Sequence, residues 1–106
     1  MPMYLTQVKY LASGVQGLIK EGAAARATNV SRMIEQAGGK VHGFYFALGE
    51  TDVFVISEYA DRSGALALSI AVNASGAVTV TQTELIAPAE IDGALKKMPA
   101  YRAPGA

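Results

Sequence analysis

The sequence predicts an α+β fold, a ferredoxin-like βαββαβ sandwich with a C-terminal helix, in which two helices cover one face of a four-stranded antiparallel sheet. Two observations favour this class. Runs rich in β-branched and aromatic residues alternate with stretches of helical period, in the order of that topology. Two of the runs, Lys40–Leu48 and Asp52–Tyr59, are joined by a short polar turn, as in a hairpin. The length of 106 residues suits one domain.

The first half of this order is a strand followed by a helix. Met3–Leu11 is rich in Tyr, Leu, Thr and Val and predicts the strand. Apolar residues then recur at helical spacing over Val15–Ala37, which predicts one helix. Gly38 and Gly39 end that helix, since glycine is favoured just past a helix end. The hairpin strands follow directly.

The second half repeats the pattern and adds a short helix. Asp61 is a predicted N-cap for a helix that runs to about Ala74. Ala77–Ile86 carries the β-branched residues of a fourth strand. A last helix is predicted over Ala89–Met98, because proline at position 88 suits a first helical turn. We therefore expect one domain over residues 1–98 and an irregular tail over residues 99–106.

Both hairpin strands carry apolar residues on both of their faces. A strand with one face in water normally alternates apolar and polar residues, so both faces of this sheet should be covered. Helices cover one face, and a second copy of the chain is the expected cover of the other. We therefore expect a homo-oligomer built on a dimeric α+β barrel. The segment Ala65–Val72 is apolar around nearly its whole circumference, which indicates that association can extend beyond the dimer.

Composition excludes several classes of partner. Nine basic residues balance nine acidic ones, so no net charge or basic run attracts nucleic acid. No apolar stretch approaches the roughly 18 residues that span a bilayer, and Met1–Tyr4 lacks the pattern of a signal peptide. We expect a cytoplasmic protein without nucleic-acid or membrane partners.

Composition and motifs also argue against a bound metal or cofactor. The chain has no cysteine, which removes disulfides, thiolate metal ligands and thiol nucleophiles. No P-loop, no dinucleotide-binding glycine motif and no H-E-x-x-H zinc motif is present. We expect no cofactor and no metal.

Arg26 is the sharpest candidate for a ligand-binding residue. An advance of about 100° per residue places it in the apolar stripe of the first predicted helix. The other members of that stripe are Val15, Ile19, Gly22, Val30 and Met33. A buried guanidinium needs a partner, and Asp52, Glu50 and Glu58 are the predicted carboxylates. Two interpretations stay open: a structural ion pair that ties the helix to the hairpin, or recognition of an anionic ligand.

His42, Tyr45 and Asp52 are the other candidates. Strand alternation places His42 on one face with Phe44, and Tyr45 on the opposite face. His42 is either a haem ligand or general base, or a hydrogen-bonded structural histidine. Tyr45, with Tyr4, Tyr10 and Tyr59, belongs to a set of phenols that either line a cavity or pack at an interface.

Two further polar features have mainly structural interpretations. Asp52 closes the hairpin turn, where an aspartate commonly accepts from backbone amides, and catalysis is the alternative. Ser69 and Asn73 are spaced i, i+4 on an otherwise apolar helix. They either bridge to the sheet or face a pocket.

Short motifs over nearly the whole chain resemble the GYD-domain family, small bacterial proteins of the dimeric α+β barrel type. The motifs are Lys9-Tyr10 with Gly14, Glu21-Gly22 with Arg26, Gly38–Val41, Gly43–Tyr45, Gly49 with Asp52-Val53, and Ala74–Val78. The family is named for a Gly, Tyr, Asp signature at the hairpin turn, where this chain has Thr51 in place of the tyrosine. The resemblance implies the fold and dimerisation and no particular activity.

Three functional hypotheses follow from these residues. The first is a small oligomeric module that binds a small organic molecule or is purely structural. The second is a cofactor-independent enzyme, oxygenase-like or isomerase-like, in which Arg26 holds a small anionic or aromatic substrate and Tyr45 or His42 moves a proton. The third is haem binding through His42.

Overall fold

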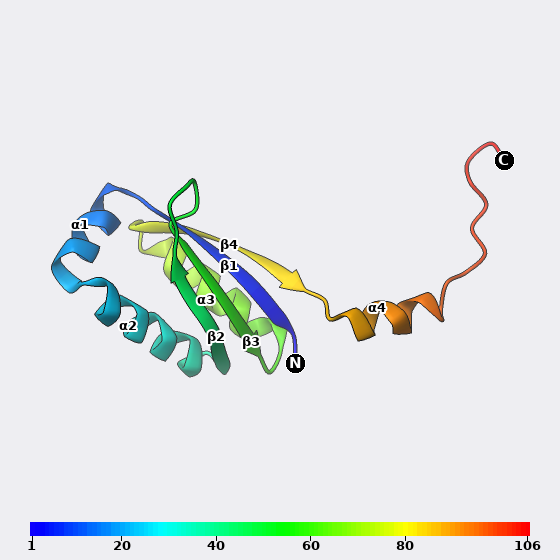
Figure 1. Ribbon diagram of the computed structural model, residues 1–106, viewed down its shortest axis with the longest axis horizontal. Helices are drawn as coiled ribbons and strands as arrows, with labels where there is room; N and C mark the ends of the chain where they lie inside the picture. The colour runs from blue at the N-terminus through cyan, green and yellow to red at the C-terminus, as the bar shows by residue number, and fades with distance from the viewer.

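The computed structural model describes residues 1–106 and shows a four-stranded antiparallel sheet with helices on one face (Figure 1). The elements are β1 (Met3–Tyr10), α1 (Ala12–Glu21), α2 (Ala23–Gln36), β2 (Gly39–Phe46), β3 (Val53–Tyr59), α3 (Arg62–Ala74), β4 (Val78–Leu85) and α4 (Pro88–Leu95). The strand order is β2-β3-β1-β4, and every neighbouring pair is antiparallel. This confirms the predicted α+β fold with a ferredoxin-like order of elements.

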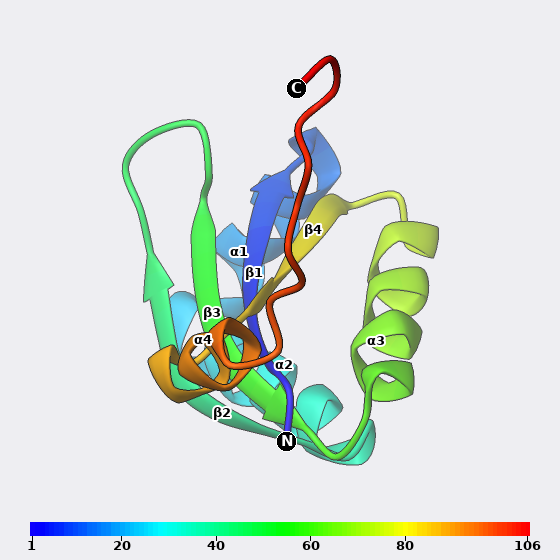
Figure 2. The ribbon, with the colours of Figure 1, turned by 90° about the vertical axis from the view of Figure 1, so that its right-hand side faces the viewer.

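The hydrophobic core lies between the sheet and the helices α2 and α3. Along β3 every second residue is buried, which is the period expected of a strand with one covered face. The buried side chains of β3 are Val53, Val55, Ser57 and Tyr59. Ile34 from α2 and Leu68 from α3 pack against them. The opposite face of the sheet, called here the open face, is covered by none of α1, α2 and α3; α4 and the tail, which lie in front of it in Figure 2, stand away from it in Figure 1.

The helix predicted as one piece over Val15–Ala37 is in fact two helices, so that prediction was wrong. Gly22 separates α1 from α2 with φ +89°, a backbone conformation that favours glycine. Its N–H donates to the Leu18 carbonyl and closes α1, and its carbonyl accepts from Arg26 N–H at 3.0 Å and starts α2. The chain thus changes direction without losing a backbone hydrogen bond at this residue.

A β-bulge in β2 corrects the predicted placement of His42. Pairing with β3 shifts by one residue between Val41 and Gly43, so that His42 is the extra residue. Val41 and Phe44 both pack against the core as a result. The His42 ring turns to Glu58 on the open face, with Nε2 2.9 Å from Oε1. Strand alternation alone cannot place a residue across a bulge.

The polar residues of α3 bridge to the sheet edge. Gln82 of β4 donates to Ser69 Oγ at 2.6 Å. Asn73 accepts from Val80 N–H at 2.8 Å and donates to the Val80 carbonyl at 3.4 Å. Asn73 therefore forms hydrogen bonds with the backbone N–H and carbonyl of Val80, which the edge strand β4 would otherwise present to another strand. Of the two sequence interpretations, the structure supports the bridge to the sheet.

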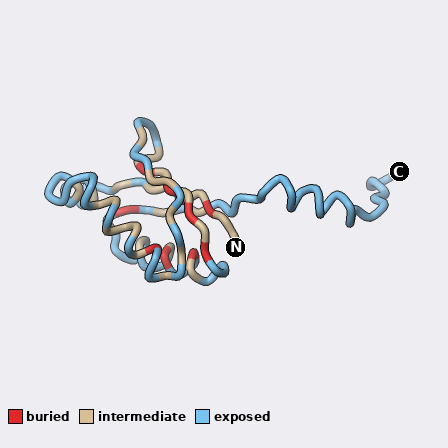
Figure 3. The backbone as a smooth tube through the Cα atoms, turned by 60° about the horizontal axis from the view of Figure 1, so that its bottom comes forward, coloured by how far each residue is buried: buried red, intermediate tan, exposed pale blue.

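The starts of α3 and α4 match their sequence signals, whereas α4 ends at Leu95, before the predicted Met98. Asp61 caps α3 by accepting from Ser63 N–H at 2.8 Å, as predicted. α4 begins at Pro88 and projects away from the rest of the molecule, fully exposed (Figure 3). The molecule consequently measures 60 × 30 × 24 Å. None of the helices has the length and apolar composition needed to cross a membrane.

Two glycines of α1 provide a matched test of this packing. A Cβ on Gly14 would lie 2.2 Å from the Ala77 carbonyl oxygen, whereas a Cβ on Gly17 would meet nothing within 4 Å. We expect Gly14→Ala to lower the free energy of unfolding by about 1–3 kcal/mol through overpacking. Gly17→Ala should raise it by about 0.5–1 kcal/mol through helix propensity. Urea denaturation measures both, and equal stabilities would contradict the close approach of α1 to Ala77, the residue before β4.

Candidate functional site

A groove runs between α1, the start of α2 and the adjoining ends of β1 and β4. It encloses about 390 Å³. Its polar lining residues are Tyr10, Ser13, Lys20, Glu21 and Arg26. Gly14 and Gly17 of α1 also line it. Because glycine has no side chain, the space beside these two residues stays open. The groove is therefore the concave, polar part of the helix-covered side of the molecule.

Arg26 lies in the first turn of α2 and is the central charge of the groove. Its Nη1 is 3.9 Å from Glu21 Oε1, and the two side chains are 28% and 29% exposed. That separation is an ion pair but not a hydrogen bond. The other carboxylate oxygen of Glu21 accepts from the Asn29 side chain. The guanidinium donates no hydrogen bond to the protein, although the Arg26 side chain as a whole is only 28% exposed.

The partner of Arg26 was predicted wrongly. Asp52, Glu50 and Glu58 were the expected carboxylates, whereas the structure brings Glu21 to Arg26. The physical reason is the turn at Gly22, because it folds the end of α1 back beside the first turn of α2. In one continuous helix the two side chains would be five residues apart on different faces.

A small apolar cavity adjoins the groove. It encloses about 30 Å³ between the helices and the sheet, and 12 of its 14 lining residues are hydrophobic. Tyr10, Arg26 and Val78 border both the cavity and the groove. Arg26 therefore stands where a charged opening meets an apolar interior. Lys20 adds a second cation to the groove, so its two cations exceed the one carboxylate of Glu21.

The structure separates the four residues predicted to bind a ligand. Arg26 lies on the helix-covered side, whereas His42 and Tyr45 lie on the open face, opposite Glu58 and Phe54 respectively. Arg26 thus cannot act on one substrate together with Tyr45 or His42 within a single chain. No group of three or more His, Asp or Glu side chains has an arrangement that would hold a metal ion.

Asp52 is tied to the strand that carries Tyr10. Its Oδ2 accepts from Tyr10 N–H at 2.8 Å, and its own N–H donates to the Val8 carbonyl at 2.9 Å. The aspartate thus joins the hairpin turn to the end of β1. It does not line the groove, and its position matches the backbone-binding role that the turn predicted.

The tyrosines do not form one cavity. Tyr4 donates to Glu84 at 3.1 Å and stacks edge-on with Tyr59 at 5.8 Å between ring centroids. Burial raises the pKa of the Tyr59 hydroxyl, which has no hydrogen-bond partner in the core. Tyr45 is 66% exposed on the open face. Of these phenols only Tyr10 borders the groove.

Sequence reasoning identified Arg26 and missed its surroundings. Glu21 was noted only in a family motif, and Lys20 and Ser13 were not named, because a single straight helix does not bring Lys20 or Glu21 to Arg26. The signal available in the sequence was Gly22, since a glycine inside a helical stripe lowers the expectation of a continuous helix.

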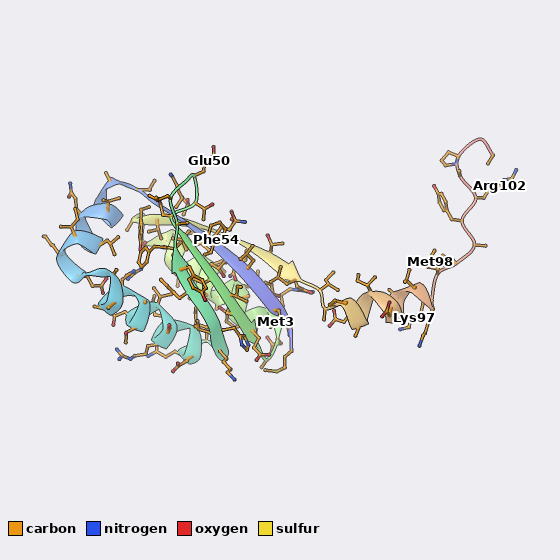
Figure 4. The ribbon with its side chains drawn as sticks, in the orientation of Figure 1. Met3, Glu50, Phe54, Lys97, Met98 and Arg102 are labelled. Carbon is orange, nitrogen blue, oxygen red and sulfur yellow. The ribbon has the colours of Figure 1, made fainter.

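The role of Asp52 can be tested through stability. We expect Asp52→Ala to lower the free energy of unfolding by about 1–3 kcal/mol, because the Tyr10 amide loses a charged acceptor. Glu50→Ala at the exposed tip of the same hairpin (Figure 4) is the matched control and should be neutral. Chemical denaturation measures both variants. A neutral Asp52→Ala would show that this hydrogen bond contributes nothing to stability.

Comparison with known proteins places the chain in a family. The crystal structure of MtbAldR matches with a TM-score of 0.54 and 24% identity, over 81% of this chain and 52% of that chain. The chain thus spans about half the length of MtbAldR, and the likeness shows the fold alone. No curated protein matches the sequence. The model of the GYD domain matches residues 4–95, so this chain belongs to the GYD-domain family that its motifs resembled.

Proposed function

We propose that this protein is a small-molecule-binding module that holds a small carboxylate in the groove beside α1, with Arg26 as the principal contact. One observation carries the proposal: the guanidinium of Arg26, whose side chain is only 28% exposed, has no hydrogen bond to the protein. Withdrawing a charged group from water without such partners is costly. An arriving carboxylate would supply them.

The geometry favours a carboxylate over a neutral ligand. A guanidinium can donate two parallel hydrogen bonds to a carboxylate, and such charge-assisted pairs are about twice as strong as neutral ones. Glu21 lies 3.9 Å away and engages Asn29, so it holds Arg26 in place without using up its donors. Lys20 adds positive charge to the same groove. An anion therefore gains more from this site than an uncharged group of the same size.

The adjoining space favours a ligand with a short apolar part. A groove of about 390 Å³ falls within the range of small-molecule sites. The apolar cavity behind Arg26, at about 30 Å³, has room for a water-sized group. Short aliphatic or aromatic monocarboxylates combine these features.

The carboxylate site can be tested by thermal unfolding. We expect a panel of short monocarboxylates to raise the melting temperature of the native protein by mass action. Arg26→Ala should fold and lose this shift, because the bidentate partner is gone. Arg32→Ala, an exposed arginine farther along α2, is the matched control and should keep the shift.

The opposite pattern would contradict the proposal. Absence of any shift with the native protein over the panel would leave the groove without a carboxylate ligand. A shift that persists in Arg26→Ala would place the ligand elsewhere.

We further propose that the open face packs against the open face of a second copy as a dimeric α+β barrel. Apolar side chains from three strands share this face: Met3, Leu5, Tyr45, Phe54 and Ile56. Helices α1, α2 and α3 lie on the other side of the sheet, and α4 stands away from this face (Figures 1 and 4). Two sheets packed about 10 Å apart would remove this surface from water. β4 contributes threonines to the same face, which suits the border of such an interface.

A charge on the open face should prevent this dimer. Ile56→Glu is expected to give the mass of one chain by light scattering, where the native protein gives two, because burying an unpaired carboxylate is costly. Gln16→Glu adds the same charge on the exposed side of α1 and should stay dimeric. Circular dichroism checks that both variants fold. An Ile56→Glu variant that folds and stays dimeric would place the interface on another surface.

A further inference from the structure

The apolar cavity behind Arg26 has little to offer a water molecule. Of its 14 lining residues 12 are hydrophobic, and the other two are Thr6 and Arg26. The Thr6 hydroxyl donates to the Gln82 side chain at 3.0 Å, so it is already engaged. A buried water needs about two to four polar partners, and apolar cavities stay dry. The cavity therefore suits an apolar group, which gains dispersion contacts with the lining side chains.

The walls of this cavity are only partly closed. Val8, Val30, Met33 and Val72 line it, and each packs against the core while staying half-buried. These residues come from β1, α2 and α3, on the side of the sheet that the helices cover (Figure 1). A small group that enters beside Arg26 thus meets walls that the core has not sealed.

Arg26 and Val30 put a charged and an apolar contact on one face of α2. They are spaced i, i+4, so their Cβ atoms lie about 5–6 Å apart. Both line the cavity, whereas of the two only Arg26 also lines the groove. A carboxylate paired with the guanidinium therefore leaves its tail within reach of Val30.

The size of the cavity limits what this tail can be. A cavity of about 150 Å³ engineered in another protein holds benzene. The cavity here encloses about 30 Å³, far too little for a ring. It admits a group of about methyl size, so a short unbranched chain is the tail that fills it.

We propose that the site selects short unbranched aliphatic monocarboxylates and that Val30 sets the tail length it accepts. The inference rests on the proposed carboxylate site. Each methylene group that becomes buried strengthens binding about fourfold. A tail larger than the cavity must either stay in water or strain the packing around it. Affinity therefore rises from acetate to butyrate and falls again for hexanoate and benzoate.

A chain-length series measured by NMR titration tests this selection on the full chain. The amide signals of protein enriched in ¹⁵N give the dissociation constants of acetate, propionate, butyrate, hexanoate and benzoate. For the native chain we expect butyrate to bind at least about fivefold more tightly than acetate. It should also bind at least about threefold more tightly than hexanoate or benzoate, because their tails overfill the cavity.

Variants at position 30 connect this profile to the cavity. Val30→Ala enlarges the cavity and should make hexanoate bind at least as tightly as butyrate. Val30→Ile fills the cavity and should remove the advantage of butyrate over acetate. Val15→Ala is the matched control, because Val15 is an exposed valine of α1 that lines neither the cavity nor the groove, and it should keep the native profile. Circular dichroism checks that the variants fold.

The outcomes separate this inference from the proposed function. If carboxylates bind through Arg26 with equal affinity whatever their tail, the selection is overturned and the carboxylate site stands. A length profile that folded Val30→Ala and Val30→Ile variants both leave unchanged overturns the role of Val30. A native chain that binds none of the five carboxylates overturns the inference and the proposed function together.

Discussion

The structure depends on one constraint: a sheet with two apolar faces has helices for only one of them. The covered face carries the core, where Val53, Val55 and Tyr59 of β3 meet Ile34 and Leu68. The other face carries Phe54 and Ile56 of the same strand, so a single strand serves both surfaces. A chain of this length buries too little surface on one side to be more than marginally stable. The association through the second face that we propose would therefore add to the stability of the fold.

The backbone conformation of Gly22, with its positive φ, determines the shape of the candidate site. It breaks a helical stripe that is otherwise continuous, and so turns the end of α1 beside the start of α2. Glu21 then steadies Arg26 from 3.9 Å, and the space under α1 becomes a groove. A non-glycine residue here would be strained whatever the surrounding space. The arrangement of the charged side chains in the groove thus follows from the backbone conformation of one residue.

The sequence predicted most of the fold, because the signals are local. Strand periodicity, the Asp61 cap and the proline at the start of α4 each act within a few residues. The predictions that failed depend on contacts distant in sequence. The bulge at His42 reflects a shift in the pairing of β2 with β3, and the one local signal is the neighbouring Gly43, since an isolated glycine in a strand can mark a bulge. Arg26 was recognisable by its place in an apolar stripe, whereas Lys20 and Glu21 join it only once the chain turns at Gly22.

The groove and the open face lie on opposite sides of the sheet and meet at one residue. The Tyr10 side chain lines the groove, while its backbone N–H is held by Asp52 in the hairpin turn at 2.8 Å. The strands of that hairpin supply Tyr45, Phe54 and Ile56 to the open face. A ligand that moves Tyr10 therefore acts on the hairpin through the hydrogen bond to Asp52 as well as through the core, against which Tyr10 also packs. For the proposed carboxylate in the groove and the proposed dimer surface, the shortest physical route between them runs along Tyr10 and Asp52.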